Sequence, residues 1–187
     1  MGQHEHGHGR ERGHEHGDRH VSPAGEHRAR GPRSVRCFAL TISDTKTEAD
    51  DASGDLIRRL AQEGGHEVVG SLIVKDEPAL IREGVLEAVG RGAQAVIASG
   101  GTGLTSRDST FEVVSQLVER PIPGFGELFR MLSFQEVGSA AMLSRATAGV
   151  LKGAVVFALP GSPNGVQLAM ERLIVPELRH VFEQLAR

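Results

Sequence analysis

Hydrophobic residues along the chain recur with two spacings, one typical of strands and the other typical of helices. Apolar, β-branched runs over residues 36–43, 66–74 and 93–99 predict three buried strands. Between these runs the apolar residues follow helical spacing. They are Leu56, Ile57, Leu60 and Ala61 between the first and second strands, and Ile81, Val85, Leu86 and Val89 between the second and third. Strands that alternate with helices predict right-handed crossovers and a mainly parallel sheet flanked by helices, which is the α/β class.

The second half of the chain extends this pattern. Ser109 and Glu112 have the spacing of a capping box and predict the start of a helix. Asp76 is a candidate N-cap for the preceding helix, with Pro78 in its first turn. The remaining segments are patterned as helix over 123–137, 142–146 and 165–187, and as two paired strands over 146–153 and 154–163.

The first 33 residues differ sharply in composition from the rest of the chain. They hold seven of the nine histidines and almost no large apolar side chain, so they cannot bury enough surface to offset the entropy cost of ordering. We therefore predict a disordered His- and Gly-rich arm over residues 1–33, followed by one α/β domain over residues 34–187. An arm that binds zinc, nickel or copper through its imidazoles is the alternative to a simple solvated leader.

Charge and cysteine content exclude several classes of protein. A formal net charge of -3 gives no electrostatic reason to expect nucleic acid or an anionic membrane as a partner. No stretch of the sequence approaches the roughly 20 apolar residues that span a membrane. Cys37 is the single cysteine and falls in a predicted core strand, so no disulfide can form within one chain. We expect a soluble, cytoplasmic protein.

The loop after the third predicted strand carries the first candidate chemistry. In open parallel sheets ligands bind beyond the carboxyl ends of the strands, and Gly100, Gly101 and Gly103 follow this strand directly. Glycines adopt positive φ and allow exposed N–H groups to approach an anion such as phosphate. The hydroxyls of Thr102 and Thr105 add further donors. The sequence therefore predicts a phosphate-binding loop.

Two aspartates at the same predicted edge indicate a metal ion as well. A carboxylate repels phosphate oxygens unless a cation lies between them, so Asp108 points to Mg²⁺, and Asp76 offers a second carboxylate from the neighbouring strand end. Each feature also has a plain structural interpretation, namely a tight glycine turn, a helix cap at Asp76, and a surface ion pair between Arg107 and Asp108. The convergence of these features on one edge favours a binding site. The loop has neither the lysine of a Walker A motif nor the spacing of a dinucleotide fingerprint.

Several motifs, taken in order, resemble those of a known family. The segments "TISDTKTEADDASGD", "IVKDEPALIREGV", "SGGTGLTSRD", "PGFGELFRMLSFQEVGSAAMLSRATAG" and "FALPGSPNGV" resemble the molybdenum cofactor biosynthesis family that includes MoaB, MogA and the G domain of gephyrin. Within that family "FGELFRMLSF" and "SRATAG" look most like the MoaB branch. The likeness covers residues 34–187 and leaves the His-rich arm outside.

The resemblance implies a molybdopterin-binding fold of three α/β/α layers, assembled as a homotrimer or as a hexamer of two trimers. It implies that the chain binds molybdopterin and adenylylates it with Mg-ATP, releases pyrophosphate and passes the product to a metal-insertion protein. A noncatalytic molybdopterin-binding or scaffold protein of the same pathway is the alternative. By motif position Asp76 and Asp108 match the catalytic, metal-binding acids of the family. The candidate ligand-binding residues are Gly100, Gly101, Thr102, Gly103, Thr105, Ser144, Arg145, Pro160, Gly161 and Ser162.

Other conspicuous side chains are assigned to structure. Phe125, Phe129 and Phe134 recur at helical spacing, so we expect them in the core or in subunit contacts rather than stacked on the pterin. Transfer between two phosphate groups needs no side-chain nucleophile. Cys37 and the histidines of the domain therefore receive no catalytic role.

Overall fold

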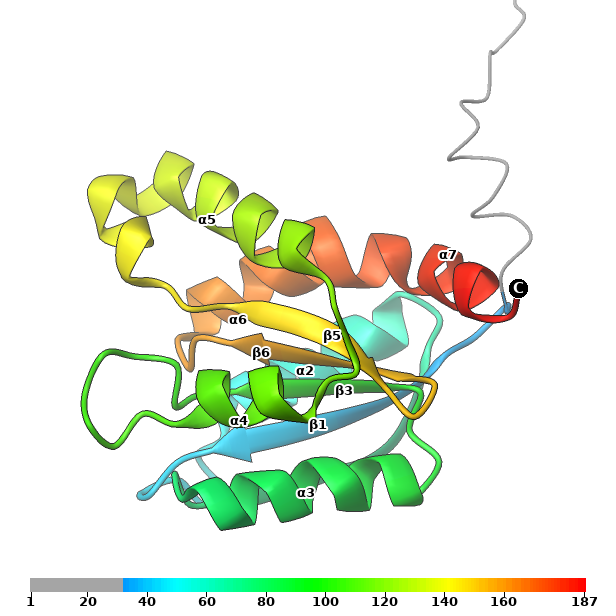
Figure 1. Cartoon of the computed structure of the whole chain (residues 1–187), viewed down its shortest axis with the longest axis horizontal. Helices are drawn as coiled ribbons and strands as arrows, with labels where there is room; N and C mark the ends of the chain where they lie inside the picture. The colour runs from blue at the N-terminus through cyan, green and yellow to red at the C-terminus, as the bar shows by residue number, and fades with distance from the viewer. Residues whose placement is uncertain (1–31) are drawn as a thin grey trace, which may run out of the picture.

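A six-stranded sheet forms the centre of the structure, a computed structural model that describes residues 32–187 (Figure 1). The predicted arm, residues 1–33, lies outside the described residues except at its last two positions. The strands follow the order β2-β1-β3-β6-β5-β4 across the sheet. Their bounds are Arg36–Ile42 for β1, Glu67–Val74 for β2, Ala95–Ser99 for β3, Arg120–Pro121 for β4, Thr147–Leu151 for β5 and Ala154–Leu159 for β6.

The sheet is mainly parallel, and the predicted α/β class is confirmed. β1 pairs in parallel with both β2 and β3, and β3 pairs in parallel with β6. β5 runs antiparallel to β6, as the two adjacent predicted strands require, and β4 runs antiparallel to β5. The sequence pattern does not predict β4, because a strand of two residues carries no periodicity.

The helices also begin and end close to the predicted positions. Pro78 opens its helix as expected, because a residue without an N–H is tolerated in the first turn. The predicted helix over 142–146 is wrong in its second half, since the segment turns extended after Leu143. The helical elements are α2 Ala52–Glu63, α3 Pro78–Gly90, α4 Thr110–Leu117, α5 Pro123–Val137, the 3₁₀ segment η1 Gly138–Leu143, α6 Pro163–Ala169, the π-helical segment η2 Met170–Ile174 and α7 Val175–Leu185.

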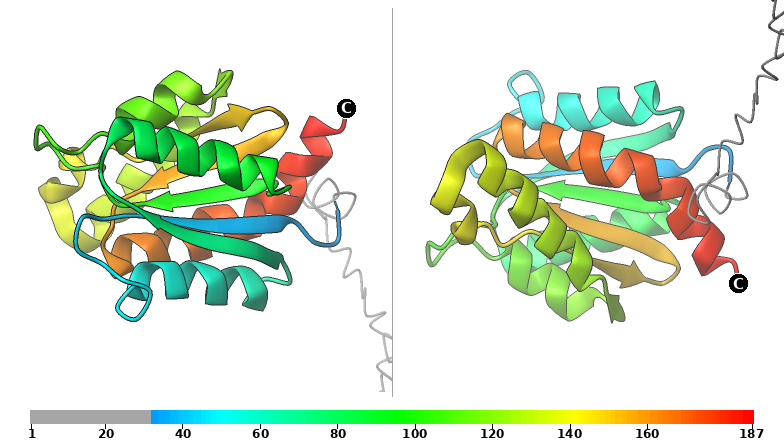
Figure 2. Two further views of the ribbon diagram at one scale, coloured as in Figure 1. Left: turned by 90° about the horizontal axis from the view of Figure 1, so that it is seen from below. Right: turned by 90° about the horizontal axis from the view of Figure 1, so that it is seen from above.

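Two layers of helices cover the two faces of the sheet, which gives the three-layer arrangement (Figures 1 and 2). Helices α2, α5, α6 and α7 pack on one face, and α3 and α4 pack on the other. Successive residues of β1 serve the two faces in turn, because side chains alternate along a strand. Cys37 and Ala39 belong to the first core cluster, whereas Phe38 and Leu40 belong to the second.

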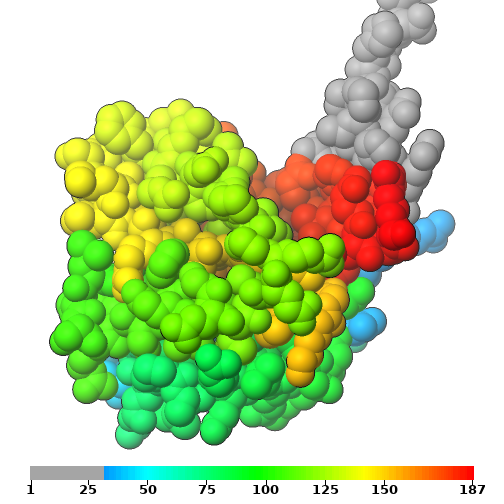
Figure 3. Space-filling view, in the orientation of Figure 1, coloured from blue at the N-terminus to red at the C-terminus, as the bar shows by residue number. Residues whose placement is uncertain are grey.

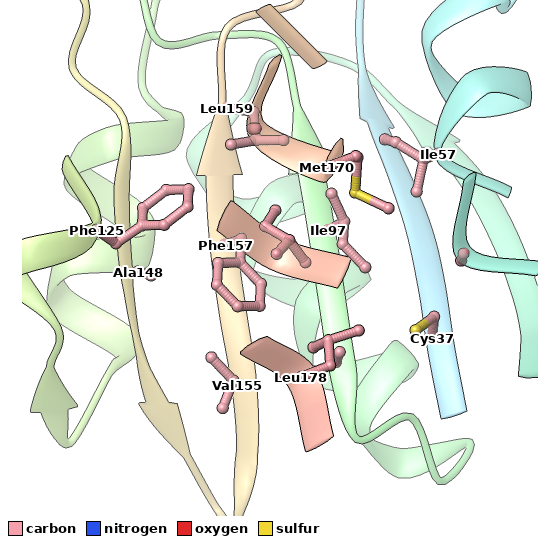
Figure 4. Close-up of a cluster of buried hydrophobic side chains, with 14 of the residues drawn as sticks. Cys37, Ile57, Ile97, Phe125, Ala148, Val155, Phe157, Leu159, Met170 and Leu178 are labelled. Carbon is pink, nitrogen blue, oxygen red and sulfur yellow. The ribbon is translucent and has the colours of Figure 1, made fainter. Parts of the chain in front are cut away.

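Buried side chains from neighbouring strands and helices fill the first core cluster (Figure 4). Phe125 of α5 meets Phe157 of β6 edge to face, with ring centroids 5.2 Å apart. Cys37 is buried as predicted, and burial raises the pKa of its thiol to about 12. Within residues 32–187 no helix is both long and apolar enough to cross a membrane.

Candidate functional site

Loops from four strands meet at one end of the sheet. Because β1, β2, β3 and β6 are parallel, their carboxyl ends share one edge, and the next residues are Ser43, Lys75, Gly100 and Pro160. The loop between β3 and α4 projects from this end, on the same side as η1 (Figure 1). This edge is where an open α/β sheet binds its ligands.

The first two positions of the loop after β3 require glycine. Gly100 has φ 107° and Gly101 has φ 61°, a region that glycine enters without steric cost. A Cβ on Gly100 would lie well under 3.0 Å from the Ile42 carbonyl oxygen, which real Cβ atoms do not approach so closely. A Cβ on Gly101 would lie 2.6 Å from Asp76 Oδ2. The loop therefore packs its bare backbone against two neighbouring strand ends.

The backbone of this loop retains donors for an anion, although fewer than the sequence suggests. The Gly100 N–H donates to the Leu159 carbonyl at 3.0 Å and is already in use. Within the described part of the chain, no hydrogen-bond partner exists for the N–H groups of Gly101 and Thr102. These two donors are the ones that a phosphate oxygen can use.

Asp108 is held as an ionised carboxylate by its own loop. Its Oδ2 accepts hydrogen bonds from the Thr105 hydroxyl at 2.6 Å and from the Thr105 N–H at 2.8 Å. The hydroxyl bond, together with the N–H groups of Thr105 and Gly103, holds the pKa of Asp108 below its ordinary value. Gly103 does not adopt the positive φ expected for it; instead, a Cβ at Gly103 would lie 2.8 Å from Asp108 Oδ2. The Thr105 hydroxyl thus serves Asp108 directly.

Asp76 ties the end of β2 to the start of α4. Its Oδ1 accepts hydrogen bonds from the Ser109 hydroxyl at 3.0 Å and from the Ser109 N–H at 3.2 Å. The predicted cap at Asp76 is wrong, because Glu77 is the N-cap residue of α3. The predicted helix start at Ser109 is confirmed, because Ser109 is the N-cap residue of α4, but its side chain makes no cap bond. The Asp76 carboxylate and the Ser109 side chain therefore bond to each other across the site, and neither caps the backbone of the helix that follows it.

The two aspartates repel one another through space. Burial is the main cause that raises the pKa of Asp76, and the negative charges of Asp108 and Asp44 raise it further against the Ser109 hydrogen bonds. A divalent cation would relieve this repulsion, and Asp76 Oδ2 has no hydrogen-bond partner among residues 32–187. In the same part of the chain no group of three or more His, Cys, Asp or Glu side chains is placed to hold a metal. The pair fits Mg²⁺ only with phosphate and water oxygens as additional ligands, which is the ligand set that Mg²⁺ prefers.

Two arginines near the loop have structural partners. Arg107 forms an exposed ion pair with Asp44 at 2.8 Å, so the predicted pair with Asp108 is wrong. Arg145 donates from Nε to the Thr102 carbonyl at 3.2 Å and from Nη2 to the Asp108 carbonyl at 3.3 Å. It also pairs with Glu112. Arg145 therefore clamps the backbone of the glycine loop from outside.

A cavity of about 450 Å³ opens beside this loop, a size within the usual range for ligand sites. Its walls come from the glycine loop, from α5 and η1, and from the turn after β6. Three of the predicted site residues, Asp76, Thr105 and Arg145, do not line the cavity; they support the loop. The predicted residues that do line it are Gly100, Gly101, Thr102, Gly103, Asp108, Ser144, Pro160, Gly161 and Ser162. Their ligand-binding roles stay predictions.

One wall of the cavity was not expected from the motifs. Phe129, Ser133, Glu136 and Val137 of α5 line it, although Phe129 was expected only as a packing residue. Their spacing of three, four and seven residues places them on one helix face. That spacing is visible in the sequence, but it is also the spacing of an ordinary core stripe. Asn164 and Leu168 of α6 complete the wall.

Buried hydroxyl groups without partners gather around the glycine loop. Within residues 32–187 the side-chain oxygens of Ser99, Thr110 and Ser144 are buried and make no hydrogen bond. Ser99 ends β3, Thr110 begins α4, and Ser144 lines the cavity. Unsatisfied buried polar groups are rare, and a ligand or ordered water is one explanation for them. Their concentration here supports a polar ligand at this end of the sheet.

A buried serine fixes the turn that forms the back of the cavity. The Ser53 hydroxyl, at the start of α2, donates to the Gly161 carbonyl at 2.9 Å. Lys46 Nζ lies 3.5 Å from the same hydroxyl and 3.9 Å from the Asp51 carboxylate. A Cβ at Gly161 would lie 3.2 Å from the Gly100 Cα, so the turn packs directly on the glycine loop.

Comparison with known proteins gives one consistent result. The family model described as "Probable molybdopterin binding domain" matches residues 38–180. Molybdenum cofactor biosynthesis protein B of Halalkalibacterium halodurans is 49% identical over 164 residues, which cover 87% of this chain and 96% of that protein. A crystal structure of a molybdenum cofactor biosynthesis protein B superposes with a TM-score of 0.81 at 49% identity, covering 83% of this chain and 98% of that one. The tungsten cofactor synthesizing protein MoaB from Pyrococcus furiosus superposes with a TM-score of 0.78 at 38% identity, covering 83% and 99%.

Proposed function

Because the chain belongs to the molybdopterin-binding domain family, we propose that it acts in molybdenum cofactor biosynthesis, where it binds molybdopterin and adenylylates it with Mg-ATP. In this reaction an oxygen of the molybdopterin phosphate bonds to the α-phosphorus of ATP. The bond from that phosphorus to the β-phosphate oxygen breaks, and pyrophosphate leaves. The observation that carries the proposal is one cavity in which Asp108 lies beside the N–H groups of Gly101 and Thr102, which have no hydrogen-bond partner among residues 32–187.

The residues of the site act by positioning and by electrostatics. The N–H groups of Gly101 and Thr102 would donate to phosphate oxygens and fix their orientation, which is the main protein contribution in phosphoryl transfer. Asp76 and Asp108 would hold Mg²⁺, which neutralises charge on the two phosphate groups as they approach. The attacking phosphate oxygen is already an anion, so no side chain has to remove a proton. Arg145 and Ser53 keep the two loops in place.

An adenylylation assay tests the enzymatic proposal. Protein, molybdopterin, Mg²⁺ and ATP are expected to give adenylylated pterin and pyrophosphate, and Asp76→Asn and Asp108→Asn should each abolish turnover while the protein stays folded. Glu87→Gln is the matched control, because this exposed carboxylate lies near the end of α3 away from the site. Turnover at the wild-type rate in both aspartate variants would refute the role assigned to the two carboxylates.

Nucleotide binding separates this proposal from the noncatalytic alternative. A molybdopterin carrier or scaffold has no need of ATP, so titration with ATP should show no Mg²⁺-dependent binding. The adenylyltransferase should bind ATP more tightly with Mg²⁺ than without it, because the cation bridges carboxylate and phosphate oxygens. Calorimetry with and without Mg²⁺ measures this difference.

We also propose that the chain assembles as a homotrimer or hexamer through an apolar face on α5 and η1. Phe134 is 61% exposed, so of the two places expected for it a subunit contact remains, whereas Phe125 and Phe129 are buried. Large exposed apolar groups gathered on one surface mark an interaction site. This part of the chain forms the upper left lobe in Figure 3, and the apolar face consists of Met131, Phe134 and Met142, which line one hollow on this surface. Phe134→Glu should reduce the mass measured by light scattering to that of a smaller assembly, and an unchanged mass would exclude this face.

Three further expectations remain hypotheses, namely a cytoplasmic location, transfer of the product to a metal-insertion protein, and metal binding by the arm. Residues 1–31 of the arm lie outside the described residues. Deleting residues 1–33 should abolish the uptake of zinc, nickel or copper without changing the oligomeric state if the arm delivers metal. Unchanged uptake would leave the solvated leader as the explanation.

A further inference from the structure

Glu136 is a charged residue of the cavity to which the proposed reaction gives no role. Within the described residues, the cavity lining contains two charged side chains, Asp108 and Glu136, and no cation. Asp108 is engaged by Thr105, whereas Glu136 forms no hydrogen bond or ion pair with any of residues 32–187. A carboxylate without a partner in a ligand cavity is available to accept hydrogen bonds from the ligand.

The position of Glu136 suits recognition of the far end of a ligand. It lies seven residues after Phe129 on the same face of α5, which is about 10 Å along a helix axis. The neighbouring walls are apolar, with Val137, Leu143 and Leu168 lining the same cavity. Ligand sites are typically mostly apolar, with a small number of polar groups that fix the orientation of the ligand.

Glu136 also marks a junction between two cavities. A second cavity of about 360 Å³ adjoins the first and shares Glu136, Asn164 and Leu168 with it. The glycine loop and Glu136 line the same cavity, so a ligand that fills it from its phosphate to its ring would contact both. The second cavity leaves space beyond that point.

We propose that Glu136 reads the donor edge of the pterin ring and selects pterin over adenine. An ionised carboxylate has two acceptor oxygens and no donor. The pyrimidine half of a pterin presents a ring N–H beside an amino group, so both oxygens receive hydrogen bonds in a charge-assisted pair. Adenine presents its amino group beside a ring nitrogen that accepts, and a carboxylate repels that nitrogen. The inference rests on the proposed function, because that function brings both rings to this site.

Fluorescence titration with 6-hydroxymethylpterin tests the inference without turnover. The probe has the donor edge and no phosphate, so its affinity reports recognition of the ring. Glu136→Gln should weaken binding of the probe about tenfold or more, because one acceptor is replaced by an amide donor and the charge is lost. Glu127→Gln is the matched control, an exposed carboxylate on the same helix that lines neither cavity. Binding of Mg-ATP should stay the same in Glu127→Gln and should not weaken in Glu136→Gln, because the Glu136 carboxylate repels adenine.

A second ligand sharpens the test. Lumazine carries a carbonyl in place of the amino group, so wild-type protein should bind it more weakly than the pterin, and Glu136→Gln should reduce that difference. Equal pterin affinity in the wild type and Glu136→Gln, or an equal loss in Glu127→Gln, would overturn the inference while leaving adenylylation intact. Failure of the wild-type protein to bind pterin at all would overturn the inference together with the pterin part of the proposed function.

Discussion

Replacing Ser53 by alanine should damage a cavity that this residue never touches. The Ser53 hydroxyl is fully buried and donates to the Gly161 carbonyl, 108 positions away in sequence, at 2.9 Å. Ser53→Ala removes the donor and leaves a carbonyl without its partner at the back of the site. Alanine is a good helix former, so the start of α2 itself should not suffer.

The size of the effect follows from the lost bond. Losing this hydrogen bond costs about 0.5–1.5 kcal/mol of the free energy of unfolding, because Gly161 is exposed and water can take the place of the hydroxyl. About 1 kcal/mol lowers the Tm of a domain this size by roughly 2–4 °C. The turn at Gly161 packs on Gly100, so it loses its anchor to α2 while it still contacts the glycine loop. If re-ordering the turn on binding costs about 1 kcal/mol, the affinity for Mg-ATP falls roughly fivefold.

Urea unfolding and calorimetric titration with Mg-ATP measure the two effects separately. Ser115→Ala on the exposed face of α4 is the control, and it should be neutral or slightly stabilising. A stability and a nucleotide affinity both equal to wild type in Ser53→Ala would refute the argument. Loss of stability with unchanged affinity would refute only the link between the turn and the site.

The described geometry supports four other predictions. Gly100→Ala should fold poorly or bind no nucleotide, since positive φ costs about 1–3 kcal/mol and the new Cβ would meet the Ile42 carbonyl; circular dichroism and ATP titration measure both losses. The raised pKa of Asp76 stabilises the wild-type fold below the ordinary value of 3.8, and this contribution is lost as pH rises through the folded pKa. At neutral pH the ionised Asp76 therefore destabilises the fold, and Asp76→Asn, which carries no charge, should raise the free energy of unfolding. Asp108→Asn should lower the free energy of unfolding at neutral pH, because the lowered pKa of Asp108 contributes stability above the ordinary value of 3.8 that is lost as pH falls through the folded pKa. Urea titrations at neutral and acid pH should show that the difference between each variant and the wild type shrinks in acid. Cys37 should react with a thiol reagent only after urea unfolding, and fast reaction of the native protein would contradict its burial.

The sequence predicts the parallel strands and the glycine loop well because their signals are local. Val96 and Ile97 belong to a short apolar run that is typical of a buried strand, and the glycines follow this run directly. Gly100 and Gly101 adopt the positive φ that the run of glycines predicts. Such features depend on a few adjacent residues, so one sequence is enough to identify them.

The side-chain partners at the site are not predictable in the same way. Asp76 and Ser109 each have the sequence position of a helix cap, and each bonds instead to the other, across 33 positions. Arg107 similarly reaches Asp44 rather than its neighbour Asp108. A side chain chooses among several possible partners according to distances that the fold sets, and a local motif does not contain those distances.

The cavity wall formed by α5 shows a second limit of prediction from the sequence. Glu136 falls on the same stripe as Phe129, which is buried, so the helical pattern alone assigns both to one face. Whether that face meets the sheet or a cavity depends on where the helix crosses the strand ends. Phe134 is a related case, because an apolar residue at helical spacing can face a second chain as well as the core.

The order of the strands has a consequence for how the protein is made. β6, the last strand to leave the ribosome, must insert between β3 and β5, and it brings the turn at Gly161 with it. A nascent chain that stalls before residue 154 holds every residue of the glycine loop yet has two open strand edges and no back wall. Synthesis must therefore be nearly complete before a nucleotide can stabilise the fold, and shortened translation products should aggregate rather than compete for substrate.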